Sequence, residues 1–292
     1  MIAEEERCDE LHEIVKQVCR NRIVLIPSGQ FPPPGVDEPE VLDCGFGNGV
    51  WIDDLLGVQE YEDCKVVGVD IYLGNRDDDE DDDDDDDDDG NNDGVQEFER
   101  KRWNLNAPFR ADPSPSQLKR EQFDLVNSRF LAEGINADRW PTYIRELKKL
   151  LKPGGWLQMV ELELVFQSDN GRLAPNASEP LYVWSEWYRH AMTQRNKNPR
   201  VGQLLGQYLQ TEGFDNVWSG PQRLEIGRWN SAFSNMDIRA NVSKTLETVL
   251  LWPCAGAPAG QRPLMSLELY RAMVQNAQAQ LQNDSLRLYY QV

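Results

Sequence analysis

The chain has 292 residues, of which 40% are apolar, and this is enough to bury a sizeable core in an α/β fold. Its formal net charge of −20 is concentrated in one place: residues 77–89 are 13 consecutive acids, and the remainder carries 37 acids against 30 bases. No basic face of the kind that binds nucleic acid is visible. No stretch approaches about 18 consecutive apolar residues and the chain opens with acids, so we expect no membrane span, no signal peptide and a cytoplasmic location.

Five cysteines are spread along the chain, and none belongs to a C-x-x-C pair. They are Cys8, Cys19, Cys44, Cys64 and Cys254. An odd number of isolated cysteines predicts free thiols in a reducing compartment and no metal site.

The first predicted element is a helix over residues 4–22, because apolar residues recur there at helical spacing. His12 lies beside the apolar face, where a structural role is the simplest interpretation. A Pro-rich stretch at residues 28–39 cannot be regular. Residues 1–40 are therefore expected to form an N-terminal helix and its linker.

A short apolar entry then leads into the pattern D-x-G-x-G-x-G, formed by Asp43, Gly45, Gly47 and Gly49. Glycine has no Cβ, so this loop can turn sharply and bring backbone N–H groups close to a ligand. The helix expected to begin at Val50 would point its partly positive end at the same ligand. The pattern predicts a nucleotide-type cradle at the carboxyl end of a first parallel strand.

Two kinds of cradle differ at the residues that follow the glycines. The dinucleotide fingerprint G-x-G-x-x-G/A needs a third small residue, whereas Val50 and Trp51 follow here. Asp43 can accept hydrogen bonds from a cationic amine, a group that a pyrophosphate lacks. The loop therefore disfavours a nicotinamide-dependent oxidoreductase, and a purely structural turn stays the alternative.

The second predicted strand, residues 65–71, carries Asp70 at its end, 21 residues after Gly49. An acid at about this distance from a glycine loop is placed to bind ribose hydroxyls. Ile71, beside it, is included among the cofactor-binding positions. The alternative is that Asp70 caps the next helix.

The acidic run predicts a disordered surface insertion over residues 76–94, because like charges repel and nothing apolar is available to bury. A functional interpretation is a tether for a basic partner or a weak cation site.

Two further strands are predicted to end at the same edge of the sheet as the glycine loop. The third lies within residues 98–108, with Asn104 near its carboxyl end. The Asn104 amide both donates and accepts, so it can match an adenine edge, and Leu105 is grouped with it. The fourth covers residues 123–129, with Asn127 near its end.

A helix over residues 140–151 is predicted to stop at a Lys-Pro-Gly-Gly sequence, since glycine supplies the positive φ that a helix end needs. Residues 156–166 are predicted as the fifth strand. The two-residue period of a strand would put Glu161 and Glu163 on the same side.

Residues 172–212 and 230–265 are expected to be additions on the acceptor side of the sheet. An aromatic face on a helix at 181–190, which ends in His190, is more simply core than binding site. Further elements are predicted as a helix at 201–209, late strands at Val217, 224–229 and 286–292, and a helix at 266–282.

Several stretches carry a more specific pattern in chain order. They are Glu6-Arg7 with His12, Phe123-Asp124-Leu125-Val126 through Arg129, Trp140-Pro141, Leu151-Lys152-Pro153-Gly154-Gly155-Trp156, Glu161, Ser168-Asp169-Asn170-Gly171, Gly213-Phe214 and Ile226-Gly227-Arg228-Trp229. Together with D-x-G-x-G-x-G, they resemble the fungal LaeA-like (UMTA) class I S-adenosylmethionine (SAM)-dependent methyltransferases. The resemblance covers nearly the whole chain, and both ends are short relative to that family.

The resemblance implies an α/β class I methyltransferase fold, with a Rossmann-like doubly wound sheet of seven strands and a late antiparallel hairpin. It also implies one SAM-dependent methyltransferase domain over residues 1–292. Many members of the family serve fungal secondary metabolism and some are nuclear regulators of it, so a nuclear location is the alternative to the cytoplasm.

The resemblance also assigns roles by position. Asp43 and the three glycines match the cofactor loop, and Asp70 matches the ribose acid. Asn104 stands where the family usually has an acid near adenine, and Asn127 stands where a histidine is usual. Both departures preserve hydrogen bonding.

Methyl transfer from a sulfonium is an in-line displacement, so the enzyme mainly has to position two partners and exclude water. A general base matters only where the acceptor must lose a proton, and the candidates are His12, Glu161 and His190. We expect a SAM-dependent methyltransferase with a small-molecule acceptor, and no metal, nucleic-acid or membrane partner. The alternative is a regulatory protein of secondary metabolism that works through protein partners with weak or no methyl transfer.

Overall fold

The computed structural model describes the backbone of residues 2–73, 98–109, 118–229, 238–251, 254, 256 and 262–292, with side chains from residue 7 onward. The expected acidic insertion, residues 76–94, lies outside the described residues. The chain forms two compact units. The first, here called the five-stranded unit, contains residues 22–129 and 141–159; the second, the three-stranded unit, contains residues 1–21, 130–140 and 160–292. The expectation of a single domain stays a prediction.

The five-stranded unit is built on a sheet in the order β3-β2-β1-β4-β5. Its strands are β1 (Glu40–Cys44), β2 (Lys65–Asp70), β3 (Glu99–Arg102), β4 (Phe123–Arg129) and β5 (Leu151–Val160). β1 pairs in parallel with both β2 and β4, and β2 pairs in parallel with β3. This order places β1 and β4 at the point where the chain reverses its direction of travel across the sheet, which is where such folds bind ligands.

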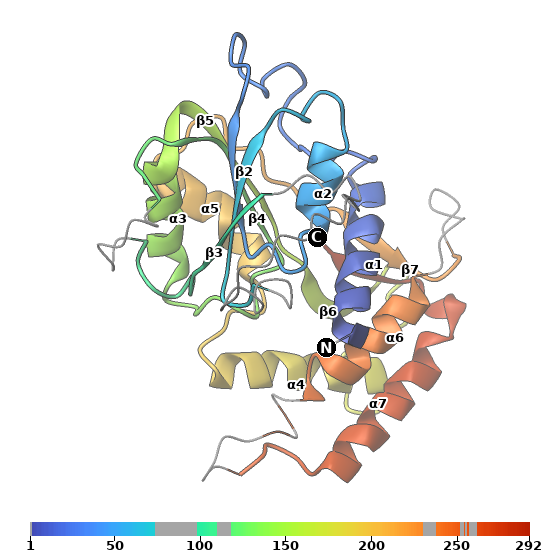
Figure 1. Cartoon of the computed structure of the whole chain (residues 1–292). Helices are drawn as coiled ribbons and strands as arrows, with labels where there is room; N and C mark the ends of the chain where they lie inside the picture. The colour runs from blue at the N-terminus through green and yellow to red at the C-terminus, as the bar shows by residue number, and fades with distance from the viewer. Residues whose placement is uncertain are drawn as a thin grey trace, which may run out of the picture. The chain divides into compact units, whose positions relative to one another are not determined.

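Two helices cover this sheet. Figure 1 shows α2 (Val50–Leu56) and α3 (Trp140–Leu150) on opposite sides of the strands, as expected of a doubly wound sheet. β4 is buried over all but its last residue, as a central strand covered on both faces should be, although it also carries the polar residues Asp124, Asn127 and Ser128. The helix expected at residues 140–151 is confirmed.

The three-stranded unit has a separate antiparallel sheet in the order β6-β8-β7. Its strands are β6 (Glu163–Ser168), β7 (Arg223–Ile226) and β8 (Leu288–Gln291). Its helical elements are α1 (Ile2–Val18), α4 (Pro180–Gln194), η1 (Val201–Leu204), α5 (Leu205–Thr211), α6 (Arg239–Thr248), α7 (Leu267–Leu281) and η4 (Asp284–Leu286). A continuous apolar core joins α1, α4, α6 and α7 to this sheet, and it contains the fully buried, stacked rings of Trp184 and Tyr188.

The expected strand pattern is wrong in two places. Residues 156–166 are not one strand, because β5 ends at Val160 in the large sheet and β6 begins at Glu163 in the small one. Val217 belongs to no strand. The described strands are therefore five plus three rather than seven, and the late antiparallel strands form a sheet of their own.

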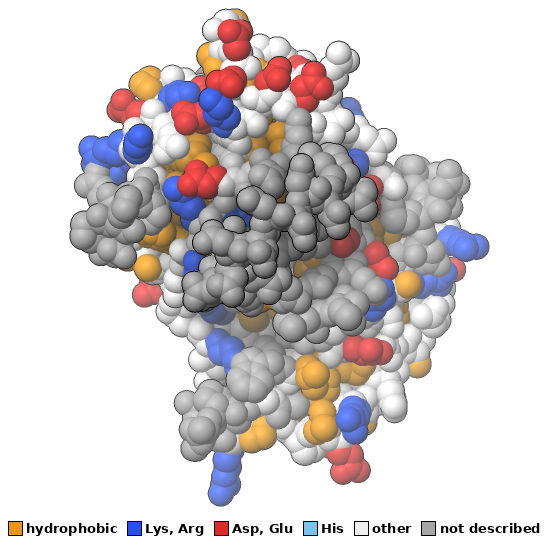
Figure 2. Space-filling model, viewed as in Figure 1, with side chains coloured by type: hydrophobic (Ala, Val, Ile, Leu, Met, Phe, Trp, Pro, Cys, Tyr) orange, Lys and Arg blue, Asp and Glu red, His pale blue; other side chains and the backbone are white. Residues whose placement is uncertain are grey.

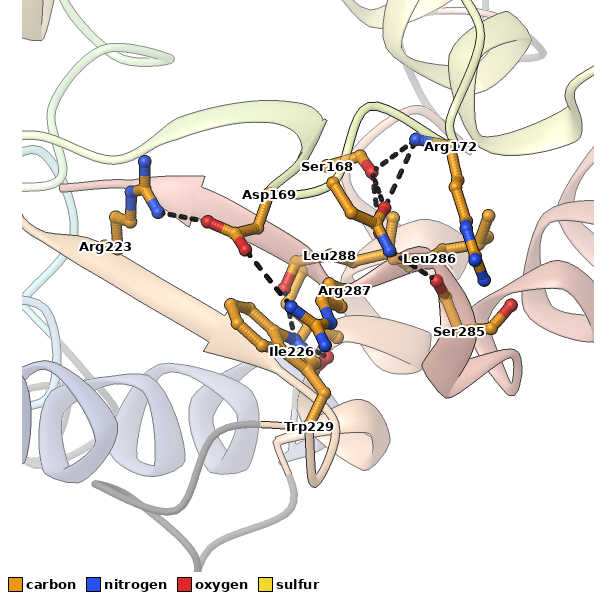
Figure 3. Close-up of polar contacts among 11 residues, drawn as sticks. Ser168, Asp169, Arg172, Arg223, Ile226, Trp229, Ser285, Leu286, Arg287 and Leu288 are labelled. Atoms are coloured by element: carbon orange, nitrogen blue, oxygen red, sulfur yellow. Dashed lines mark hydrogen bonds and ion pairs between the residues drawn. The ribbon is translucent and has the colours of Figure 1, made fainter.

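A joint at the end of β6 accounts for one of the stretches that carried the family resemblance (Figure 3). The Ser168 hydroxyl donates to the Leu286 carbonyl at 2.7 Å, and the Asn170 amide donates to the Ser285 carbonyl at 2.8 Å. Asp169 pairs with Arg223 at 2.7 Å. This turn thus ties β6 to the chain before β8 and to β7, so its polar residues have a structural role.

The surface in Figure 2 carries acidic and basic side chains interspersed. In the five-stranded unit, exposed acids precede β1 and β2, and among them are Asp37, Glu38, Glu62 and Asp63. They therefore lie at the amino edge of the parallel strands, opposite the edge where the glycine loop leaves β1. None of the described helices is long and apolar enough to cross a membrane.

Candidate functional site

The glycine loop between β1 and α2 holds its three glycines in a left-handed conformation. The φ angles are +74° at Gly45, +60° at Gly47 and +93° at Gly49. Glycine adopts this conformation without a steric penalty, whereas other residues are strained there. The pattern D-x-G-x-G-x-G is therefore explained by the backbone that the loop must adopt.

The three glycines do not face the same surroundings. A Cβ added to Gly49 would meet the ring of Phe98 at 3.3 Å, whereas a Cβ added to Gly47 would meet nothing within 4 Å. Phe98 also packs edge-on against Phe46 of the loop, with ring centroids 5.4 Å apart. The loop is therefore packed at Gly49 and open at the exposed Gly47.

Asp70 at the end of β2 anchors this loop. Its Oδ2 accepts the Gly47 N–H at 3.0 Å, and its Oδ1 accepts the Tyr72 N–H at 3.1 Å. The Gly45 N–H donates to the Val69 carbonyl at 2.7 Å. Residues 71–73 form no helix, so the described chain gives no support to the interpretation of Asp70 as a helix cap. Ile71 points into solvent, with 65% of its surface exposed.

Asp43, which lies in β1 two residues before Gly45, is almost fully buried, with 3% of its surface exposed. Its Oδ1 accepts a hydrogen bond from the Asn127 amide at 2.8 Å. Burial raises the pKa of Asp43 to about 7, and the negative charge of Asp70 acts in the same direction. The Asn127 hydrogen bond and the positive charge of Arg129 lower this pKa but do not outweigh burial.

Asn127 is itself held by Gln158 of β5. The Gln158 Nε2 donates to the Asn127 Oδ1 at 3.0 Å and to the Ile23 carbonyl at 3.1 Å, while the Gln158 Oε1 accepts the Leu25 N–H at 2.6 Å. Gln158 is not among the site residues predicted from the sequence. Its signal was a lone amide in an apolar stretch, Trp-Leu-Gln-Met-Val, where a strand was expected.

The third strand is shorter than predicted, because β3 ends at Arg102 and Asn104 lies in the turn beyond it. The Asn104 Oδ1 accepts the Asn106 N–H at 3.0 Å, and Leu105 is buried. The Trp103 N–H donates to the Asp70 carbonyl at 2.6 Å, so this turn begins next to the residue expected to bind ribose. All the expected cofactor positions thus lie in the five-stranded unit.

The three candidate bases all lie in the three-stranded unit. Glu161 is buried between β5 and β6, where its two oxygens accept the N–H groups of Leu131 and Ala132, both at 2.9 Å. Burial raises the pKa of Glu161 to about 8, although these two hydrogen bonds lower it. His12 is buried within α1, and His190 is exposed on α4.

The expectation that Glu161 and Glu163 share one side of a strand is wrong. Glu161 lies outside both strands, whereas Glu163 begins β6 and binds Arg200 at 2.9 Å and Gln203 at 2.7 Å. The chain changes sheets between the two residues, so the two-residue period does not continue across them. The described contacts of both carboxylates are structural.

Comparison with known proteins defines the class. A family model described as a methyltransferase domain matches residues 11–219. The sheet order and the glycine loop are those of the class I, Rossmann-like methyltransferase fold, whose cofactor is SAM. The chain belongs to this methyltransferase-domain family.

Individual relatives confirm the likeness to LaeA-like proteins. The chain is 24% identical to the secondary metabolism regulator LAE1 of Cochliobolus heterostrophus over 85% of its own length and 76% of that protein. It is 23% identical to the methyltransferase pytC of Aspergillus terreus, over 77% of its own length and 59% of that protein. It is 25% identical to the secondary metabolism regulator laeA of Monascus pilosus, over 78% of its own length and 53% of that protein. The chain thus spans little more than half the length of two of these three relatives.

Proposed function

We propose that this protein is a SAM-dependent methyltransferase that acts on a small molecule of the secondary-metabolite type. One observation carries the proposal: the open, left-handed Gly47 donates its N–H to the Asp70 carboxylate, in a loop that directly follows the buried Asp43. Backbone approach to a ligand is possible at Gly47 because a Cβ there would occupy space that no protein atom fills. The single methyltransferase domain expected for residues 1–292 is part of the same proposal.

The residues around the loop fit the parts of SAM. Asp43 would accept from the cationic amine, and Asp70 would accept from the ribose hydroxyls, which are hydrogen-bond donors. Ile71, Leu105 and Asn104 would line the adenine, with the exposed Ile71 offering an apolar surface that gains from being covered. Asn127 would act through Asp43. When bound, the cofactor supplies an electrophilic methyl group on sulfur.

The chain's own contribution to transfer is positioning rather than acid–base chemistry. Positioning of two reactants can be worth about 7–11 kcal/mol. Glu161 is poorly suited to act as a base, because it is buried, with 4% of its surface exposed, and its carboxylate holds the backbone at Leu131 and Ala132. His190 and His12 stay candidates for acceptors that must lose a proton. The segments 172–212 and 230–265 are proposed to shape the acceptor site.

Isothermal titration with SAM and with NAD tests the cofactor assignment. We expect SAM, and its product S-adenosylhomocysteine, to bind and NAD not to bind. Preferential binding of NAD would sink the assignment. Transfer of a labelled methyl group to a panel of phenolic and carboxylic acceptors then tests the reaction.

A second function is favoured by the two relatives that are named secondary metabolism regulators. In that case, the protein would bind SAM and work through protein partners, in the nucleus, with weak or no methyl transfer. Binding of SAM without turnover on any acceptor of the panel would support this function over the first. Turnover at an ordinary enzymatic rate, at or above about 1 per second, would reject it.

A further inference from the structure

Two buried amides, here called the amide relay, connect the cofactor loop to the segment before β1. The relay consists of Asn127 on β4 and Gln158 on β5, whose side chains are 1% and 6% exposed. It runs from the backbone of residues 23 and 25 through Gln158 to Asn127, and from Asn127 to Asp43. All of these residues lie in the five-stranded unit.

The backbone fixes the orientation of the first amide. A backbone N–H can only donate, so the Leu25 N–H requires the oxygen of Gln158 to face it. A backbone carbonyl can only accept, so the Ile23 carbonyl requires the nitrogen of Gln158. Gln158 therefore has one orientation that satisfies both partners.

That orientation determines the next one. The Gln158 nitrogen also donates to the Asn127 Oδ1, so the Asn127 oxygen must face Gln158 and the Asn127 nitrogen must face Asp43. The relay thus presents a donor, never an acceptor, to the Asp43 carboxylate. A donor at that position stabilises the ionised form of a carboxylate.

The other groups acting on Asp43 are few. Asp70 on the neighbouring strand β2 opposes its ionisation, Arg129 on β4 favours it, and burial, the largest of these effects, opposes it. Asp43 therefore lies near the balance point between its two protonation states at neutral pH. A change in one hydrogen bond is enough to shift that balance.

We infer that Gln158 is a positioning residue, which fixes the Asn127 amide so that the ionised form of Asp43 is stabilised as an acceptor for the ligand's cationic amine. This inference rests on the proposed function. It assigns part of the ligand's affinity to a side chain that does not touch the ligand, and it predicts that this part depends on pH.

The test uses two ligands and two variants. S-adenosylhomocysteine carries the amine, whereas 5′-methylthioadenosine has the same nucleoside and a thioether but no amine. Gln158→Glu places an acceptor where Asn127 needs a donor, which favours reversal of the Asn127 amide. Gln158→Met keeps a similar volume and removes the orienting bonds. Both ligands are titrated calorimetrically against wild type and each variant at pH 7.

In Gln158→Glu, we expect the affinity for S-adenosylhomocysteine to fall by about tenfold or more, since the charged hydrogen bond between the Asp43 carboxylate and the ligand's amine is lost. Gln158→Met should show a smaller loss, because it allows either orientation of Asn127. The affinity for 5′-methylthioadenosine should change by less than about twofold, since this ligand has no amine for Asp43 to bind. Equal losses for the two ligands would indicate general damage to the loop and would overturn the inference.

A measurement on the wild type needs no variant and covers the case in which neither folds. In the wild type, the affinity for S-adenosylhomocysteine relative to that for 5′-methylthioadenosine should fall as the pH is lowered from 8 to 6, because protonation of Asp43, whose pKa is raised by burial to about 7, removes the anionic acceptor for the amine. Calorimetric titration of both ligands over this pH range measures the affinity ratio. A ratio that does not change with pH overturns the inference. Failure of the wild type to bind either ligand refutes the proposed function instead.

Discussion

Replacement of Gly47 by alanine separates the role of this residue as backbone from its role as ligand cradle. At φ +60°, alanine pays the left-handed penalty of roughly 1–2 kcal/mol. No steric clash adds to this, since a Cβ at Gly47 would meet nothing within 4 Å. The melting temperature should therefore fall by about 2–8 °C, because 1 kcal/mol corresponds to about 2–4 °C in a chain of this size.

The effect on the ligand should be larger. A methyl group forced into a close contact typically costs about 1–3 kcal/mol, which is roughly a 5- to 150-fold loss of SAM affinity. Gly154→Ala is the matched control. Gly154 also lies in the five-stranded unit, has φ +83°, and would place a Cβ with nothing within 4 Å. Titration and thermal melting of both variants should give similar stability losses and a SAM affinity that falls only in Gly47→Ala. If the two variants bound SAM equally well, the cradle would lie elsewhere.

Four further predictions follow from charge and hydrogen bonding. Asp70→Ala should weaken SAM by roughly 10²- to 10⁴-fold if two charged hydrogen bonds to ribose are lost, and Asp70→Asn by less, as measured by titration. Burial raises the pKa of Asp43 to about 7, so between pH 4 and 7 the folded state binds a proton that the unfolded chain has released. The free energy of unfolding should therefore fall by about 1–4 kcal/mol as the pH rises from 5 to 8. Urea unfolding of Asp43→Asn should show a shallower decline, with the remainder due to Glu161; a decline as steep as that of the wild type would contradict this origin. Asp169→Ala should cost less than about 1 kcal/mol in the same assay, since its ion pairs are partly exposed. Deletion of residues 77–89 should leave SAM affinity unchanged and raise stability at low salt, because 13 like charges are removed.

The central strands and the glycine loop could be predicted from sequence because each is determined locally. Each of β1, β2 and β4 contains a short apolar pair, namely Val41-Leu42, Val66-Val67 and Leu125-Val126, and buried parallel strands are rich in such residues. The positive φ angles at Gly47 and Gly49 follow from a loop that must turn sharply.

The elements that were missed depend on partners far away in the chain. The side-chain pattern of residues 156–166 predicts extended backbone, but it does not show which sheet each half joins. The break after Val160 therefore could not be predicted from the sequence. Gln158 reads as an isolated polar residue until the backbone of residues 23–25 is placed beside it. The hydrogen bonds that the Glu161 carboxylate accepts likewise come from backbone N–H groups 29 and 30 positions earlier in the chain.

The geometry also explains why this glycine loop suits SAM better than a dinucleotide. A pyrophosphate is bound through backbone N–H groups, and the exposed one at Gly47 already donates to the Asp70 carboxylate. An anion would have to displace that carboxylate while lying within a few ångströms of its charge, and like charges at 4 Å repel by about 4 kcal/mol at an effective dielectric constant of 20. Ribose hydroxyls and an amine avoid both the displacement and the repulsion, because they donate hydrogen bonds to Asp70 and Asp43 instead of competing with these carboxylates. The loop backbone alone would accept either class of ligand, so the two carboxylates, rather than the glycines, carry the selectivity.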